Sequence, residues 1–315
     1  MKRGQFFLVF YDKRKYVKAE LMVGKIIKGV AGAYTVVADG DKTYECKAKG
    51  IFRKNGISPL VGDNVEFEIT DASDNEGNIL KILKRKNELI RPACANIDQV
   101  LIVFAAADPE PNYNLLDRFL VLMMKQSVST VVCFNKKDIV DSEKLAVIAG
   151  NYEASGVKVI FSSVLFGEGA EEIRKILKGK TTILAGPSGV GKSSMMNMLF
   201  PEAGMEVGEL SRKIKRGKQT TRHTELVRIE DDTYLCDSPG FSSIYLNDIE
   251  FKDLKSFFPE FAAYSDKCRF LSCNHISEPD CAVKQAVADG KISKSRYGNY
   301  CLLYDELKNV RKYKE

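Results

Sequence analysis

Short runs of strand-forming, largely apolar residues alternate with Gly and polar turns after the first 21 residues of the chain. Five of them, separated by Gly and polar turns, span 23–30, 33–39, 42–48, 64–70 and 77–83. Short runs of this kind bounded by Gly and polar residues are typical of β-strands. Five short strands without an intervening helix predict a small closed barrel over residues 22–90. We favour an OB-like barrel, the common five-stranded form, and keep an SH3-like barrel as the alternative.

A different rhythm begins at Asp98. Continuous apolar runs, typical of buried parallel strands, alternate with helical patterns such as the stretch at 115–126. The runs span 98–106, 129–135, 157–163 and 181–186, and two further strand patterns span 225–231 and 233–238. This βαβ order predicts an α/β domain over residues 91–247, with a mostly parallel sheet covered on both faces. Residues 248–315 carry two helical patterns and form a third expected domain, and residues 1–21 form a mobile extension.

Charge and composition narrow the function only a little. The chain of 315 residues carries 48 Lys and Arg against 42 Asp and Glu, a net charge of +6, which permits an anionic partner without requiring one. No run of about 18 apolar residues exists, so we expect no membrane span. The short apolar stretch near the N-terminus lacks the features of a secretion signal, so we expect a cytoplasmic protein.

A complete phosphate-loop pattern, GxxxxGK[ST], runs from Gly186 to Ser193. It follows a strand pattern and opens a helix pattern, which is the context in which this motif binds nucleotide. Its glycines let backbone N–H groups turn inward around phosphate oxygens, and the helix N-terminus adds a partial positive charge. Lys192 can reach the β and γ phosphates, and the Ser193 hydroxyl can ligate Mg²⁺. The sequence therefore predicts a nucleoside triphosphate site.

Two further loops select the base. Asn135-Lys-Lys-Asp138 ends one predicted strand, and Ser162-Ser-Val164 ends the next. A carboxylate at Asp138 can accept hydrogen bonds from both N1–H and the N2 amine of guanine, whereas adenine offers the wrong pattern. Asn135 can brace the loop, and the stem of Lys136 can cover the base plane. These residues favour GTP and argue against an ATPase or a kinase.

The remaining nucleotide motifs come after the phosphate loop. Asp237-Ser-Pro-Gly240 has the DxxG form that places Mg²⁺ and the γ-phosphate, and Thr220 or Thr221 can act as the switch threonine, with Thr221 slightly favoured. The base-reading loops therefore precede the phosphate loop, whereas conventional GTPases begin with it. This order leaves the chemistry intact, because ligands bind beyond the carboxyl ends of parallel strands whatever the connections.

The chain has eight cysteines and two histidines, and three of the cysteines and one histidine form a cluster. Cys268, Cys273, His275 and Cys281 supply three thiolates and one imidazole within 14 positions, a complete tetrahedral set for a structural Zn²⁺. The other cysteines are scattered singly, which fits a reducing compartment rather than a disulfide framework.

The motifs in this order resemble one family, the circularly permuted ribosome small-subunit-dependent GTPase A. The resemblance covers about Met22 to the C-terminus and includes KNELIRPACANIDQVLIVFAA, LLDRFL, GPSGVGKSS, TTRHTEL and DSPGFSS. It implies a permuted P-loop GTPase domain between the OB-like barrel and a zinc-binding helical segment. It also implies GTP hydrolysis stimulated by the 30S subunit, a role in late 30S maturation near the decoding region, and one structural zinc. We expect contact with 16S rRNA, and a monomer that uses neither membrane nor DNA. A GTP-dependent rRNA-binding switch with incidental hydrolysis is the alternative.

The expected nucleotide-binding residues are Asn135, Lys136, Lys137, Asp138, Ser162, Ser163, Gly186, Pro187, Ser188, Gly189, Val190, Gly191, Lys192, Ser193, Ser194, Thr220, Thr221, Asp237 and Gly240. The expected magnesium ligands are Ser193, Thr221 and Asp237.

Hydrolysis needs a group that orients the attacking water. Ras-type GTPases place a Gln just after DxxG, and this chain has Phe241 there, so we expect slow intrinsic turnover. The resembled family commonly has a His before the switch threonines, where this chain has Gln219. Gln219 is our candidate, His223 is a weaker one, and Lys192 and Thr221 complete the expected catalytic set.

Two basic segments are candidates for RNA contact. Residues 211–222 carry six basic side chains and no acidic one, and a smaller cluster follows the barrel at Lys81, Lys84, Arg85 and Lys86.

Overall fold

The computed structural model describes residues 21–38, 42–50, 52, 56–71, 73–90, 92–200, 224–230, 232–237, 244, 246 and 248–312. The N-terminal extension, the basic segment 211–222 and the switch residues between 219 and 223 lie outside this range. The described residues form two compact units. One holds the barrel together with strands β12 and β13 and the start of β11, and the other holds β8 to β10 and the helices.

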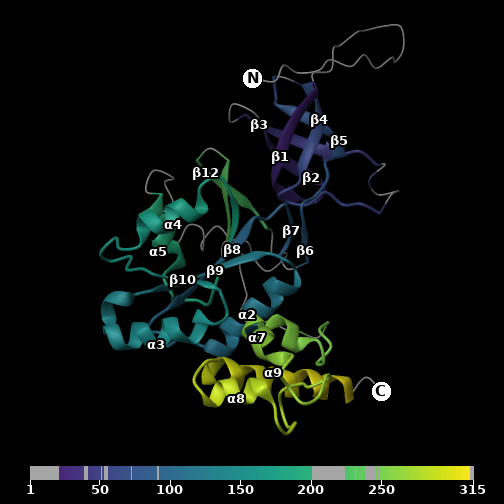
Figure 1. Ribbon diagram of the computed structural model, residues 1–315. Helices are drawn as coiled ribbons and strands as arrows, with labels where there is room; N and C mark the ends of the chain where they lie inside the picture. Colours follow the sequence, from purple (N-terminus) through teal and green to yellow (C-terminus); the bar gives the residue numbers. More distant parts are fainter. Residues whose placement is uncertain are drawn as a thin grey trace. The chain divides into compact units, whose positions relative to one another are not determined.

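The first five strands close into a barrel. They are β1 (Leu21–Val30), β2 (Ala33–Ala38), β3 (Thr43–Ala48), β4 (Asn64–Asp71) and β5 (Glu76–Ile82). Their order around the barrel is β1-β2-β3-β5-β4, with β3 and β5 parallel (Figure 1). This Greek-key order is that of the OB-fold, which confirms the prediction over the SH3-like alternative. The alternating inward positions, including Ile26, Val36, Phe67 and Ile79, are fully buried and fill the barrel.

A short hairpin follows the barrel, formed by β6 (Glu88–Ile90) and β7 (Ala93–Ala95). It was not predicted, because strands of three residues are too short to show a period.

Six strands form the sheet of the α/β domain. They are β8 (Gln99–Ala105), β9 (Ser129–Asn135), β10 (Lys158–Phe161), β11 (Thr181–Ala185), β12 (Leu226–Glu230) and β13 (Thr233–Asp237). The strand order is β10-β9-β8-β11-β13-β12, with β8, β9 and β10 parallel and β12 antiparallel to β13. Every residue of β8 and β11 is buried, as expected of parallel strands covered on both faces. Strands β9 and β10 lead into the two base-reading loops, and both precede β11, which leads into the phosphate loop. The domain is therefore circularly permuted.

The helices are α2 (Tyr113–Lys125), α3 (Ser142–Glu153), α4 (Ala170–Leu177), α5 (Lys192–Leu199), α7 (Ala262–Ser265), α8 (Ala282–Ala288) and α9 (Lys294–Lys312), with 3₁₀ turns η1 (Lys137–Ile139), η3 (Leu254–Phe257) and η4 (Pro259–Phe261). Asn112 caps α2 and Asp141 caps α3, each accepting from a backbone N–H three residues on. Helix α3 was not predicted, since only Ile148 and Tyr152 of its residues are buried and its apolar stripe is weak. None of the helices in the described ranges combines the length and the apolarity needed to span a membrane.

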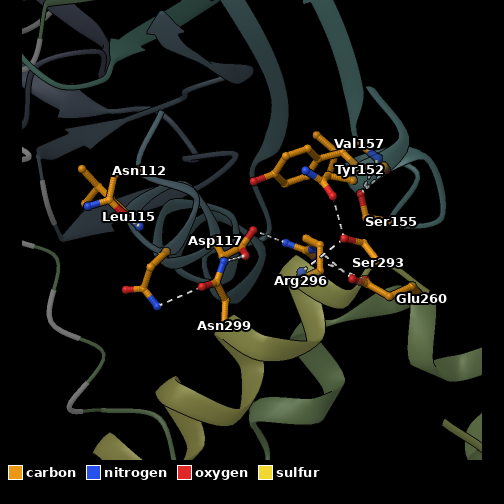
Figure 2. Close-up of polar contacts among 12 residues, drawn as sticks. Asn112, Leu115, Asp117, Tyr152, Ser155, Val157, Glu260, Ser293, Arg296 and Asn299 are labelled. Carbon is orange, nitrogen blue, oxygen red and sulfur yellow. Dashed lines mark hydrogen bonds and ion pairs between the residues drawn. The ribbon is translucent and has the colours of Figure 1, made fainter. Parts of the chain in front are cut away.

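A buried ion cluster attaches α9 to α2. The Arg296 guanidinium lies 2.6 Å from Asp117 on α2 and donates to both carboxylate oxygens of Glu260 on η4, at 2.8 and 3.1 Å (Figure 2). Asn299 donates to the second oxygen of Asp117 at 2.6 Å. The guanidinium also lies over the ring of Tyr152 at the end of α3, 5.4 Å from its centroid. The C-terminal helices therefore dock on α2 and α3 through charges that are almost wholly removed from water.

Candidate functional site

The phosphate loop needs glycine at its tightest positions. Gly186 has φ +136°, and a Cβ there would lie 2.0 Å from the carbonyl oxygen of Val103 on β8. Gly191 has φ +94°, and a Cβ there would lie 2.4 Å from the amide nitrogen of Asn135. Both the backbone angle and the space therefore exclude a side chain. The loop is held tightly between β8 and the Asn135 loop.

Helix α5 begins directly after this loop. Its N-cap is Gly191, so no side chain caps the start of the helix, an arrangement that suits anion binding. The Lys192 ammonium donates to the carbonyls of Gly186 and Pro187 at 2.8 and 2.7 Å, inside the loop where phosphates would lie. Ser188 and Gly189 are exposed, whereas Val190 is buried against the core. Ser193 and Ser194 lie on the first turn of α5.

Asn135 joins the phosphate loop to the second base-reading loop. Its side-chain nitrogen donates to the carbonyl of Val190 at 3.0 Å. Its side-chain oxygen accepts from the hydroxyl of Ser162 and from the backbone N–H of Val164, each at 3.2 Å. Asn135, Ser162 and Ser163 are all buried. Three loops that are distant in sequence are thus tied together by one amide.

The rest of the first base-reading loop turns outward. Lys136 has φ +61° and its ammonium donates to the carbonyl of Asp108 in the loop after β8. Lys137 lies at the start of η1 and pairs with Glu168. Asp138 is exposed on the same turn. The structure therefore brings the base-reading loops and the phosphate loop together as the motifs suggested.

The third nucleotide motif is described only in part. Asp237 ends β13, and β13 is the neighbour of the phosphate-loop strand β11 in the sheet, with Tyr234 N–H donating to the carbonyl of Lys180 at 2.9 Å. Gly240, Gln219, Thr220, Thr221 and His223 lie outside the described residues, as does the side chain of Asp237.

The Cys3His set has the geometry of a tetrahedral metal site. The ligand atoms of Cys268, Cys273, His275 and Cys281 all lie within 4.8 Å of one another. Cys268 Sγ is 3.8 Å from Cys281 Sγ, and the Nδ1 of His275 is 3.6 and 3.4 Å from these two sulfurs. Zinc bonds of about 2.3 Å to sulfur and about 2.0 Å to nitrogen would separate two sulfurs by roughly 3.8 Å and a sulfur from a nitrogen by roughly 3.5 Å. The donor set therefore fits zinc in both chemistry and spacing.

Neighbouring groups orient this cluster. The Nε2 of His275 lies 3.3 Å from the hydroxyl of Ser265, which leaves Nδ1 to face the sulfurs. From α9, Tyr297 donates to the carbonyl of His275 at 2.7 Å and Tyr300 to that of Asn274 at 2.5 Å. Burial lowers the pKa of His275 to about 4, so the imidazole stays neutral and ready to ligate at neutral pH.

The basic cluster at the end of the barrel is mostly neutralised. Arg85 forms an ion pair with the buried Asp63 at 2.8 Å, Lys86 pairs with Asp98 at 2.8 Å, and Lys81 with Glu66 at 3.4 Å. Of the four cations, Lys84 alone has no ion pair among the described residues. These side chains stabilise the end of the barrel, and they are weaker candidates for RNA contact than their charges suggested.

Sequence reasoning missed two sets of ion pairs. One is the ion pair of Lys137 with Glu168, which no motif marks because Glu168 lies between two glycines in an ordinary loop. The other is the Asp117–Arg296 cluster, for which a signal was available: a charged pair interrupts the apolar helix pattern LLDRFL, and a buried charge requires a partner.

Comparison with known proteins places these observations in a family. The model of the RsgA GTPase family matches residues 82–247, and that of the RsgA N-terminal domain matches residues 23–79. The small ribosomal subunit biogenesis GTPase RsgA of Agathobacter rectalis is 53% identical, with 93% of this chain and 100% of that one covered. The protein of the same name from Alkaliphilus metalliredigens is 46% identical, with 92% and 99% covered.

Solved structures agree. YjeQ from Thermotoga maritima superimposes with a TM-score of 0.77 at 36% identity, covering 91% of this chain and 98% of that one. YloQ, described as a circularly permuted GTPase, superimposes with a TM-score of 0.75 at 36% identity, covering 95% and 99%. The resemblance stated from the sequence is confirmed: the chain belongs to the RsgA GTPase family.

Proposed function

We propose that this GTPase hydrolyses GTP on the small ribosomal subunit during its biogenesis, and that the 30S subunit stimulates the hydrolysis. The observation that carries the proposal is the Asn135 junction, which ties the phosphate loop to both base-reading loops with three hydrogen bonds. A guanine nucleotide needs these loops together, and the named relatives serve small-subunit biogenesis.

Each nucleotide group has a candidate partner. The N–H groups of residues 188–194 would hold the phosphates, and Lys192 would leave its loop carbonyls for the β and γ oxygens. Asp138 would select guanine, with Lys136 beside the base and Ser162 and Ser163 forming the opposite loop. Ser193, Thr221 and Asp237 would hold Mg²⁺, which neutralises charge on the transferred phosphate.

The chain lacks the usual residue that orients the attacking water. Because Phe241 occupies the place of the Ras-type glutamine, the free protein should turn over slowly. We propose that Gln219 orients the water and that docking on the 30S subunit places it. Replacement of Gln219 by Ala tests this role, and unchanged 30S-stimulated turnover would remove Gln219 from the mechanism.

The remaining parts have separate tasks. We propose that the barrel (22–90) and the basic segment 211–222 contact 16S rRNA, that the domain at 91–247 carries the nucleotide, and that residues 248–315 form a zinc-stapled unit. We also propose that the protein acts as a cytoplasmic monomer. A zinc ion would add folding free energy to that of the apolar core that this unit already has around Phe258, Phe261 and Tyr300.

Single-turnover hydrolysis tests the function directly. We expect GTP to be preferred over ATP, and cleavage to accelerate at least tenfold with purified 30S subunits and not with 50S subunits. Lys192→Ala should abolish the stimulated rate. If 30S subunits bind the GTP form without accelerating cleavage, the protein is a GTP-dependent binding switch.

A further inference from the structure

An ion pair joins the two base-reading loops at their outer edge. The Lys137 ammonium lies 2.5 Å from a carboxylate oxygen of Glu168, with the lysine side chain 30% exposed and the glutamate 52% exposed. Lys137 belongs to the NKKD loop, and Glu168 lies five residues past the pair Ser162-Ser163. The pair therefore spans the two loops that would enclose a guanine base.

Both partners are fixed by their own backbones. The N–H of Lys137 donates to the carbonyl of Ser162 at 3.0 Å, so this residue is anchored to the second loop at its main chain as well as its side chain. Glu168 exchanges two backbone hydrogen bonds with Ser163, at 3.0 and 3.1 Å. Gly169 follows with φ +80°, where a Cβ would lie 2.7 Å from the carbonyl of Phe161. The ion pair therefore joins two residues whose main chains are already held by hydrogen bonds.

The next residue is the one that reads guanine. Asp138 lies on the one-turn helix η1 that Lys137 begins, it is exposed, and its carboxylate has no hydrogen bond or ion pair among the described residues. Its direction is therefore set through its own backbone, which continues from Lys137. Any rotation of Lys137 would swing the Asp138 carboxylate.

We propose that Glu168 is a positioning residue for guanine recognition, which holds Lys137 and thereby aims the Asp138 carboxylate at the base. The inference rests on the proposed function, since it deepens the same nucleotide site. Glu168 does not touch the base in this account. It acts by keeping the two loops at the spacing that a two-bond contact to guanine requires.

Hypoxanthine provides the discriminating ligand. Guanine offers Asp138 both N1–H and the N2 amine, whereas hypoxanthine offers N1–H alone. A correctly oriented carboxylate accepts the second hydrogen bond, from the N2 amine, and a misoriented one does not. The ratio of GDP to IDP affinity therefore reports the aim of Asp138, and a general loss of loop stability would weaken both ligands equally.

The experiment measures GDP, IDP and ADP binding by competition with a fluorescent guanine nucleotide. For Glu168→Gln we expect GDP affinity to fall about fivefold and IDP affinity less than twofold, as an ion pair of this kind allows. Lys137→Met should give the same loss, and the two changes together should give no more than either alone. The exchange K137E/E168K should restore the GDP to IDP ratio to within about twofold.

Glu172→Gln is the matched control. Glu172 on α4 pairs with Lys158 on β10 at 2.9 Å, and both side chains are 51% exposed. Both residues lie outside the base-reading loops. The GDP to IDP ratio of Glu172→Gln should equal that of the wild type. Equal loss of GDP and IDP affinity in Glu168→Gln, or no loss, would overturn the inference alone. A wild-type chain that binds GDP no better than ADP would overturn the proposed function and the inference with it.

Discussion

Replacement of Arg296 by Met tests how the C-terminal helices are held. The Arg296, Asp117 and Glu260 side chains are 3%, 0% and 2% exposed, and one guanidinium compensates two carboxylates. Methionine keeps an unbranched apolar side chain but removes the charge, which leaves two buried carboxylates without the cation that they share. Breaking a buried pair in this way costs about 3–5 kcal/mol, because the desolvated charge that remains has lost its partner.

Hydrogen exchange of the α9 amides measures this free energy locally. A loss of about 3–5 kcal/mol corresponds to exchange that is faster by about two to four orders of magnitude, at roughly 1.4 kcal/mol per factor of ten. Lys291→Met is the matched control, since its ion pair with Asp289 at 3.3 Å is solvent-exposed and should contribute less than about 0.5 kcal/mol. An acceleration of less than tenfold in the Arg296 variant would refute the view that this cluster holds α9 in place.

The pH dependence of α9 protection in the Arg296 variant tests whether the buried carboxylates cause the loss of stability. Burial raises the pKa of Asp117, and Arg296 opposes that rise, so removing Arg296 should raise this pKa further. A carboxyl whose pKa is higher in the folded state binds more protons there than in the unfolded chain, so its stability cost is relieved as the pH falls through the folded pKa. The Arg296 variant should therefore regain part of its lost protection as the pH is lowered from 7.5 through the raised pKa of Asp117. No recovery would mean that the buried carboxylates are not the source of the loss.

Three further changes test the nucleotide and metal sites. Asn135→Ala removes three hydrogen bonds of about 1 kcal/mol each, so GDP affinity should fall about a hundredfold in a fluorescence titration, and a loss below fivefold would contradict the role of this junction. Gly186→Ala places a methyl 2.0 Å from the Val103 carbonyl and should destabilise the chain by more than about 2 kcal/mol in thermal unfolding, a result that an unchanged midpoint would exclude. The purified wild type should contain one equivalent of zinc by elemental analysis, and Cys281→Ser should lose it, whereas full retention in the variant would argue against the Cys3His site.

The fold was readable from the sequence where local patterns are strong. The barrel strands are short β-forming runs between Gly and polar turns, and the buried strands β8 and β11 are largely apolar runs, so each was predicted within a few residues. Helix α3 and the hairpin β6–β7 left no such pattern, because one buries only two residues and the other has three-residue strands. Their form depends on tertiary neighbours rather than on their own periodicity.

The site was readable where chemistry imposes spacing. The phosphate loop requires Gly186 and Gly191 at fixed positions. The four zinc-ligand candidates can be identified because three Cys and one His lie close together in the sequence. The link between Lys137 and Glu168 could not be predicted, because surface ion pairs have no sequence signature and depend on how two loops meet. The pairing of the basic cluster after the barrel could not be predicted for the same reason: Arg85 pairs with Asp63, which is 22 residues away in the chain.

Steady-state GTP hydrolysis with each ribosomal subunit tests the central claim most directly. Wild-type protein and Lys192→Ala would be compared at equal concentrations of purified 30S and 50S subunits. The account predicts slow turnover alone, strong acceleration of the wild type by 30S subunits, and none by 50S subunits or in the Lys192 variant. Equal rates with and without 30S subunits, or a larger effect of the 50S subunit, would contradict it.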